Sequence, residues 1–252
     1  MAPRYGTIDV EYAGRLANGA PDEDGPVLMV NYMKYRERAE YRDGSDEGRT
    51  GKEADDAYAP TEVLADIGAV VAFFGDVIDD TASTGWDRIG IVQYASRRSF
   101  IEMQSRGDFR EKHRHKEAGM DHTIVFGVPP HLVTGTAPGR TSRVVFDLVR
   151  TDAPTAAPTA APTAGQVAGP VEGTIMGDGR VWSELRVTWL ADGDPLPPLL
   201  HIPRRTTDLS VRQIDNEIVL CVPKPTVTTE ATEIRRLKEI RIWRMTRQKD
   251  QG

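Results

Sequence analysis

The chain has 252 residues, of which 39% are hydrophobic and 28% are charged. These fractions are typical of a folded globular protein, and the length allows one large domain or two small ones. The formal net charge of -6 argues against a nucleic-acid or membrane-surface partner, and no apolar run is long enough to span a membrane. Cys221 is the single cysteine, so no internal disulfide can form, and the N-terminus lacks an apolar signal segment. We therefore predict a cytoplasmic protein.

Four short apolar runs in the first half, rich in β-branched or aromatic residues, predict four strands. The runs are 27–33, 70–78, 89–94 and 122–128. Helical patterns lie between them at 60–67, which begins with Pro60, and at 96–103, where Ser96 is a candidate N-cap. The resulting order, β-α-β-β-α-β, is that of a ferredoxin-like unit.

A charged, glycine-containing segment at 34–58 separates the first predicted strand from the first predicted helix. It is longer than an ordinary connection between two elements. Two interpretations stay open for it, a solvated surface loop and a lid over a pocket.

Three stretches of the second half resemble strands of the first half, in the same order. Residues 182–188 resemble 86–92, residues 215–224 resemble 121–130, and 146–148 resemble 30–32 more weakly. This similarity predicts an internal duplication. Chance similarity between apolar strands is the alternative.

The second copy is predicted to have lost its helices. Its first helix is replaced by three Ala-Pro-Thr-Ala repeats at 153–164, and proline at that density excludes a helix. Its second helix is interrupted by Pro195, Pro197 and Pro198.

We predict an α+β fold of two tandem ferredoxin-like units whose sheets form one α/β barrel within the chain. The units span 1–136 and 137–228, with a low-complexity linker at 151–168 in the second. A C-terminal extension covers 229–252, where the pattern at 232–243 fits either a helix or a strand.

Two stretches of the first half carry a family resemblance. They are 86–100, Trp-Asp-Arg-Ile-Gly-Ile-Val-Gln-Tyr-Ala-Ser-Arg-Arg-Ser-Phe, and 115–123, His-Lys-Glu-Ala-Gly-Met-Asp-His-Thr. Together with the order of elements, they resemble the dimeric α/β barrel superfamily and, within it, a family of unknown function. More distantly, they are similar to antibiotic-biosynthesis monooxygenases, EthD-like proteins and muconolactone isomerases. The resemblance implies two four-stranded sheets packed face to face and is compatible with a role in natural-product metabolism.

Strand alternation divides the predicted strands into two faces. The set that we place under the helices comprises Ile89, Ile91 and Gln93. The set that we place in the barrel interior comprises Arg88, Gly90, Val92 and Tyr94. Asn31 and Asp147 occupy matched positions among apolar neighbours, where they either line a pocket or make a structural hydrogen bond.

Four of the five histidines lie between positions 113 and 131, among basic residues. Histidine is the natural acid or base near neutral pH, so we predict that His115 and His122 are catalytic and that Arg114 holds an anionic group. A solvated, charged helix end is the alternative. The predicted substrate-binding residues are Asn31, Tyr32, Trp86, Arg88, Tyr94 and Asp147.

The sequence has no His-x-x-x-His motif, no cysteine pair and no glycine-rich nucleotide loop, so we predict neither a metal nor a cofactor. We expect an enzyme that acts on a small hydrophobic organic molecule, with a homodimer possible. Its chemistry would be acid/base-assisted isomerisation, cyclisation, elimination or cofactor-free oxygenation. The alternatives are a non-catalytic protein that binds haem or another hydrophobic ligand, and a structural protein with a packed barrel interior.

Overall fold

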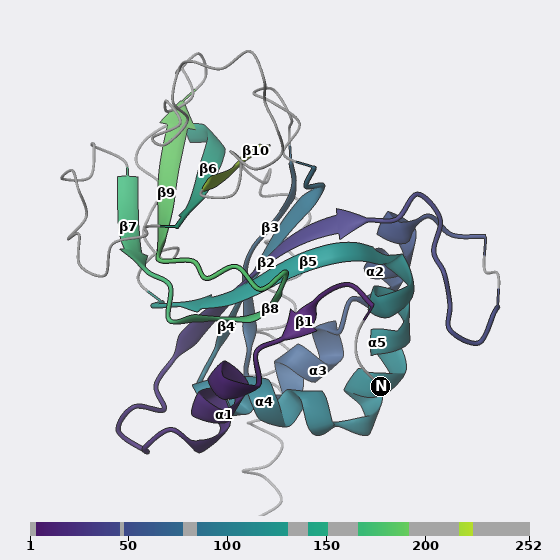
Figure 1. Cartoon of the computed structure of the whole chain (residues 1–252), viewed down its shortest axis with the longest axis horizontal. Coiled ribbons are helices and arrows are strands. Elements are labelled where there is room, and N and C mark those ends of the chain that lie inside the picture. The colour runs from purple at the N-terminus through teal and green to yellow at the C-terminus, as the bar shows by residue number, and fades with distance from the viewer. Residues whose placement is uncertain are drawn as a thin grey trace, which may run out of the picture.

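The computed structural model describes residues 4–45, 48–77, 85–130, 141–150, 166–191 and 217–223. In these residues the chain is an α+β protein with two antiparallel sheets (Figure 1). The six-stranded sheet runs, in spatial order, β1 (Thr7–Ile8), β8 (Gly173–Gly177), β5 (Met120–Val128), β2 (Val27–Tyr35), β4 (Arg88–Tyr94) and β3 (Val70–Asp76). The four-stranded sheet runs β10 (Glu217–Pro223), β6 (Thr141–Val149), β9 (Glu184–Ala191) and β7 (Gln166–Pro170).

The four strands predicted in the first half are present as β2, β3, β4 and β5. The helix predicted at 60–67 is α3 (Thr61–Asp66), and the helix predicted at 96–103 is α4 (Arg97–Ser105). Ser96 caps α4, because its hydroxyl accepts a hydrogen bond from the Ser99 N–H at 3.1 Å. The order β-α-β-β-α-β is therefore confirmed for this half.

Three further helices are α1 (Val10–Asn18), α2 (Gly51–Tyr58) and α5 (Gly107–Gly119). Helix α2 occupies the end of the 34–58 segment, for which we left a surface loop and a lid over a pocket as alternatives and predicted no helix. It begins at a capping box, in which the Glu53 N–H donates to Thr50 Oγ1 at 3.2 Å and the Thr50 N–H donates to the Glu53 carboxylate at 2.8 Å. The described part of the chain contains no helix that is long and apolar enough to cross a membrane.

Two glycines bring α2 close to α5. A Cβ on Gly51 would clash with the backbone oxygens of Arg36 and Gly119, and a Cβ on Gly119 would clash with the backbone oxygen of Gly51. Because neither residue has a side chain, the start of α2 packs directly against the end of α5. This contact holds both helices over the same face of the six-stranded sheet.

The two sheets lie face to face with an apolar core between them (Figure 1). The rings of Phe73 on β3 and Phe146 on β6 meet edge to face, with centroids 4.9 Å apart. The Tyr32 hydroxyl donates a hydrogen bond to the Phe146 carbonyl at 3.4 Å. The largest buried side chains here include Tyr32, Phe126, Phe146, Leu148, Ile89 and Ile91.

Our assignment of the two faces of β4 is wrong. Ile89 and Ile91 point into the core between the sheets, whereas Gly90, Val92 and Tyr94 face the helices. We expected residues of mixed polarity between the sheets. The apolar residues are there instead, because both sheets bury their most hydrophobic face against each other.

The helices cover the opposite face of the six-stranded sheet and build a second core with it (Figure 1). Leu16 of α1, Phe100 and Met103 of α4, and Phe109 of α5 are buried against Met29 of β2. The six-stranded sheet is thus covered on both faces, by helices on one and by the second sheet on the other.

The two sheets share strand order and register. β5-β2-β4-β3 in one sheet corresponds to β10-β6-β9-β7 in the other. Asn31 of β2 lies opposite Gly90 of β4, and Asp147 of β6 lies opposite Arg186 of β9. β8 departs from this correspondence, because it comes from the second half of the sequence but pairs with β5 in the first sheet.

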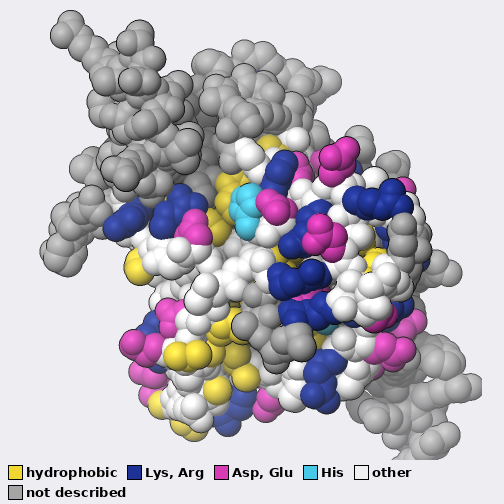
Figure 2. Space-filling view, turned by 45° about the vertical axis from the view of Figure 1, so that its right-hand side comes forward, with side chains coloured by type: hydrophobic (Ala, Val, Ile, Leu, Met, Phe, Trp, Pro, Cys, Tyr) yellow, Lys and Arg dark blue, Asp and Glu magenta, His cyan; other side chains and the backbone are white. Residues whose placement is uncertain are grey.

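Several predicted features lie outside the described residues. They are the Ala-Pro-Thr-Ala repeats at 153–164, the segment around Pro195, and the C-terminal extension at 229–252. On the face shown in Figure 2, basic and acidic side chains of the described residues intermingle and form no patch of a single charge.

Candidate functional site

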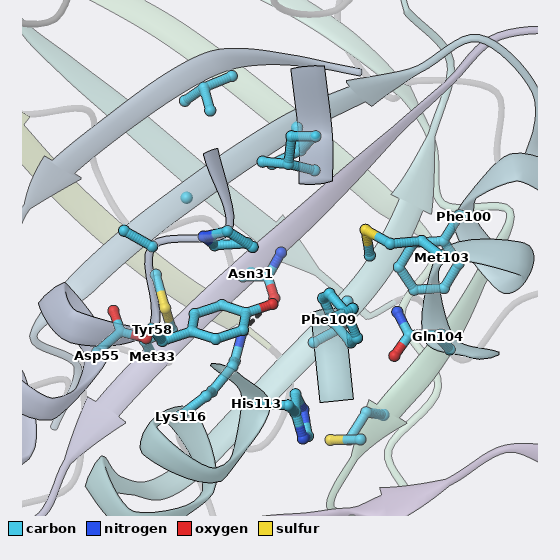
Figure 3. A pocket seen from close by; sticks show the side chains of 18 of the residues that line it. Asn31, Met33, Asp55, Tyr58, Phe100, Met103, Gln104, Phe109, His113 and Lys116 are labelled. Atoms are coloured by element: carbon cyan, nitrogen blue, oxygen red, sulfur yellow. Dashed lines mark hydrogen bonds between the residues drawn. The ribbon is translucent and has the colours of Figure 1, made fainter. Parts of the chain in front are cut away.

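A cavity of about 860 Å³ lies between the helices and the six-stranded sheet (Figure 3). Its floor comes from β2, β3 and β4, and its roof from α2, α3, α4 and α5. Ile8 of β1 and Ile175 of β8 close one side. The volume is in the range of sites that hold small organic ligands.

Most of the cavity wall is apolar. Its apolar residues include Leu64, Phe73, Phe74, Val92, Phe100 and Met103. Gly90 has no side chain that would rise from the floor into the cavity. A Cβ at this position would lie 3.2 Å from Phe74 Cδ2 and 3.3 Å from Met33 Cε. A hydrophobic molecule would therefore find a matching environment over most of its surface.

Polar groups gather at one end of the cavity. Phe109, His113 and Lys116 project from one face of α5, because they are four and three residues apart. Figure 3 shows Lys116 close to Tyr58 on one side of the cavity, while Phe100 lies on the other side. We call the end at Lys116 the polar end and the opposite end the apolar end, where Gln104 lies beside Phe100 and Met103.

Lys116 is the cationic side chain of the cavity wall. Its Nζ donates a hydrogen bond to Asn31 Oδ1 at 3.3 Å and lies 5.2 Å from the centre of the Tyr58 ring. Among the described residues, no carboxylate lies within 4.0 Å of this amine. Burial lowers the pKa of Lys116, and the charge of Asp55 acts in the opposite direction.

His113 lies one turn before Lys116 on α5. Its Nε2 forms a hydrogen bond of 2.9 Å with the Tyr5 hydroxyl, and its ring packs against Phe109 and Tyr58. Burial lowers the pKa of His113 to about 4, and the charge of Lys116 adds to this effect. The imidazole is therefore neutral at neutral pH.

Burial also raises the pKa of three tyrosines that line the cavity, Tyr5, Tyr58 and Tyr94. Their hydroxyls stay protonated at neutral pH and can donate hydrogen bonds. The Tyr94 hydroxyl faces Met103 Sδ at 3.7 Å, at the apolar end.

A charge cluster around the buried residues Arg88 and Asp55 borders the polar end. Arg88 donates to Asp76 at 2.8 Å and to Asp56 at 2.6 Å, and its guanidinium also lies 3.4 Å from Asp55. The Tyr35 hydroxyl donates to Asp55 at 2.6 Å. Arg88, which we predicted to bind substrate, is thus occupied by carboxylates, while Asp55 and Asp56 also line the cavity.

The structure places the three predicted catalytic residues outside the cavity wall. His115 is on α5 but faces Tyr41, whose hydroxyl is 2.9 Å from His115 Nδ1. Arg114 lies over the Tyr41 ring. His122 is exposed on β5, where its Nδ1 is 2.9 Å from Asp121.

Of the other predicted substrate-binding residues, Asn31 and Tyr94 line the cavity. Tyr32 and Trp86 lie instead in the core between the sheets, with ring centroids 6.0 Å apart. Asp147 is in the four-stranded sheet, which contributes no residue to the cavity wall. Side chains alternate between the two faces of β2, so Asn31 points to the cavity and Tyr32 points to the core between the sheets.

The residues that dominate the polar end, which are Lys116, His113, Tyr58 and Asp55, were not among the predicted site residues. Once Phe109 is known to be buried, the spacing of Phe109, His113 and Lys116 identifies the two polar residues of α5. A helix anchored by buried Phe109 carries the residues four and seven positions later on the same buried face.

Among the described residues, no group of three or more histidine, cysteine, aspartate and glutamate side chains is arranged to hold a metal ion. His113 and His115 diverge on α5, as residues two apart on a helix must.

A scan against protein-family models and a search of the curated proteins find no match. Among solved structures, the chain is similar to two crystal structures of the RPA0582 protein, which is described as a protein of unknown function from Rhodopseudomonas palustris. Both are 27% identical and cover 52% of this chain, and 96% and 98% of their own chains, with TM-scores of 0.44 and 0.42. A variant of chlorite dismutase from Candidatus Nitrospira defluvii is 8% identical, with a TM-score of 0.37, and covers 85% of this chain and 96% of that chain. At these TM-scores the likenesses assign no function.

Proposed function

We propose that the cavity binds a small, largely hydrophobic organic molecule and that its side chains move a proton to or from this molecule. The chemistry is an acid/base-assisted isomerisation, cyclisation, elimination or cofactor-free oxygenation. The observation that carries the proposal is the Lys116 amine, which borders an apolar cavity of about 860 Å³ beside the amide of Asn31.

The polar end supplies complementary roles. Lys116 and Asn31 can hold an oxygen atom of the ligand, since the amine and the amide both carry N–H donors. His113 is neutral at neutral pH, and its Nδ1 can accept a proton when its Nε2–H donates to the Tyr5 hydroxyl. Tyr58 keeps its proton and can donate a hydrogen bond. In this proposal Lys116 and His113 take the roles that we predicted for His115, His122 and Arg114.

Ligand binding without turnover is the alternative function. For haem, the axial ligand from this cavity would be His113. Its Nε2 is already engaged with the Tyr5 hydroxyl at 2.9 Å, and iron binding through that atom would break this hydrogen bond. An organic molecule leaves the bond intact, which favours it over haem as the occupant.

We also propose that the chain is a diverged member of the dimeric α/β barrel superfamily, with a natural-product intermediate as its substrate. We further propose that its two sheets arose by duplication. Matching backbone contacts support the duplication. The Asp87 N–H donates to the Met33 carbonyl at 2.9 Å, and the Ser183 N–H donates to the Val149 carbonyl at 2.9 Å. These two pairs lie at equivalent places in the two sheets.

The proposal is tested with 2-tetralone, a hydrophobic ketone with acidic C–H bonds next to its carbonyl. The protein is incubated with it in D₂O, and deuterium uptake at carbon is followed by NMR. We expect wild-type protein to accelerate the exchange and Lys116→Met to lose the acceleration. The control is Lys52→Met, which removes an exposed lysine paired with Asp76 at 2.6 Å.

Equal exchange by wild-type protein and folded Lys116→Met would contradict the proposal. Saturable binding of 2-tetralone without any exchange would support the alternative of a binding protein.

A further inference from the structure

We infer that the molecule bound in the cavity carries an aldehyde or ketone group and that Lys116 forms a covalent imine with it. This inference rests on the proposed function, and it narrows the substrate class from hydrophobic molecules to hydrophobic carbonyl compounds.

The surroundings of Lys116 differ from those of the other lysines whose contacts the structure gives. Lys34 lies 2.9 Å from Asp87, and Lys52 lies 2.6 Å from Asp76. Each of these two amines therefore has a carboxylate as its partner. Lys116 instead has the neutral amide oxygen of Asn31 as its acceptor at 3.3 Å. Its amine is therefore held at the cavity wall without being neutralised by an ion pair.

Burial also favours the neutral amine of Lys116 over the charged one, which lowers its pKa. Asp55 is the carboxylate that acts against this effect. Asp55 accepts a hydrogen bond from Tyr35 at 2.6 Å and lies 3.4 Å from Arg88. Its negative charge is therefore partly balanced by the guanidinium of Arg88. A desolvated lysine in a hydrophobic pocket is a recognised form of activated nucleophile.

The reaction balances without an oxidant or a reductant. The neutral amine of Lys116 attacks the carbonyl carbon, and a C–N bond forms. The carbonyl oxygen then leaves as water, together with the two protons of the amine, and an imine remains. Protonation of the imine by solvent or by a cavity side chain makes it electron-withdrawing.

The protonated imine acidifies the C–H bonds next to it, so a neutral base can remove one of these protons. His113 lines the same cavity one helical turn away and is unprotonated at neutral pH. The imine thus explains how one lysine and one histidine could isomerise a substrate or eliminate a group from it without a bound cofactor.

The test uses 2-naphthaldehyde as the carbonyl probe and sodium cyanoborohydride at neutral pH to reduce any imine to a stable secondary amine. Intact-mass measurement counts the adducts, and peptide mapping locates them. We expect one adduct, on Lys116, and a yield at least about tenfold lower in Lys116→Arg, because a guanidinium stays protonated. Lys52→Arg should react like the wild type.

A parallel titration with 2-naphthylmethanol, which has the same rings but no carbonyl, reports whether the cavity binds such molecules. If the alcohol binds and protects Lys116 from the aldehyde, the adduct forms inside the cavity and the inference is supported.

If the alcohol binds but the aldehyde leaves Lys116 unmodified, or labels Lys34, Lys52 and Lys112 at the same rate, the inference is overturned while the proposed function stands. If neither probe binds, both are overturned.

Discussion

Four strands of the first sheet share their order and register with the second sheet, and one cross-strand position shows how the two sheets differ. In the first sheet this position pairs Asn31 with Gly90, and in the second it pairs Asp147 with Arg186. Gly90 leaves space on the outer face of its sheet, and a cavity lies there. Arg186 has its guanidinium 3.7 Å from Asp147 and also pairs with Glu184. One sheet therefore has room for a ligand where the other has a charged side chain.

This difference shows where the two halves could diverge. The faces that the sheets turn toward each other keep large apolar residues in both, including Tyr32 and Phe146. The outer faces of the two sheets do not pack against each other, so their residues need not match across a shared core. If the two sheets arose by the proposed duplication, the cavity developed on the outer face of the first sheet, while the shared face remained a structural core.

The largest expected effect tests the shared core. Phe146→Ala removes a side chain that is 0% exposed and contacts Phe73, so we expect a loss of about 3–5 kcal/mol in the free energy of unfolding. Val92→Ala, at the half-buried cavity wall, is the comparison and should cost less. Chemical denaturation measures both, and a similar cost would show that the inter-sheet space is no better packed than the cavity wall.

The next effect concerns the charge cluster beside the cavity. Arg88→Met leaves the buried carboxylate of Asp55 without its guanidinium, and we expect a loss of about 3 kcal/mol. Arg180→Met removes a guanidinium that pairs with half-exposed Asp178 and should cost less than about 1 kcal/mol. If Arg88→Met also costs less than about 1 kcal/mol, the Arg88 cluster does not stabilise the fold.

The pH dependence of stability tests the burial of His113. Its pKa is lowered from 6.5 to about 4 in the folded chain, so the unfolded chain binds a proton first as the pH falls. The stabilisation from neutral His113 is complete above pH 6.5 and is lost as the pH falls toward 4. We expect this to amount to roughly 3 kcal/mol.

His113→Gln keeps a hydrogen-bonding partner for Tyr5 but cannot titrate. Denaturation at several pH values should show a shallower loss of stability in this variant than in the wild type. Identical pH profiles would show that His113 is solvated in the folded protein.

The substitution with the smallest expected effect on stability tests the difference between the two sheets most directly. Gly90→Leu places a side chain on the cavity floor, close to Phe74 and Met33, and we expect a cost of about 1 kcal/mol, since the cavity offers room for part of it. Binding of 2-naphthylmethanol should be lost in this variant. Unchanged affinity in the folded variant would place the ligand elsewhere.

Sequence patterns predicted the elements of the first half well, because each strand is a short apolar run and Ser96 marks the start of α4. They failed for α2 and α5, whose sequences are so charged that no apolar stripe is evident. Helix α2 depends on the capping box of Thr50 and on the close contact between Gly51 and Gly119. The second of these involves residues far apart in the sequence and is visible only in the fold.

The candidate site was predicted only in part. Asn31 was selected as a polar residue among apolar neighbours. Tyr94 was selected as part of the set that we placed in the barrel interior, and it lines a cavity on the opposite face of the sheet. His115 and His122 were favoured by residue type alone, although side-chain direction on a helix or strand decides which residues reach a cavity. Lys116 was overlooked, since a lysine in a charged segment gives no sign of burial until α5 is placed on the sheet.

The most direct test of the central claim is a crystal structure of the protein with 2-tetralone. The account predicts that the ketone lies between β4 and α5, with its rings toward Phe100 and Met103 and its oxygen, or an imine carbon, at Lys116 Nζ. Density for the ketone only on the outer surface, with the cavity closed by rearranged side chains, would contradict the account.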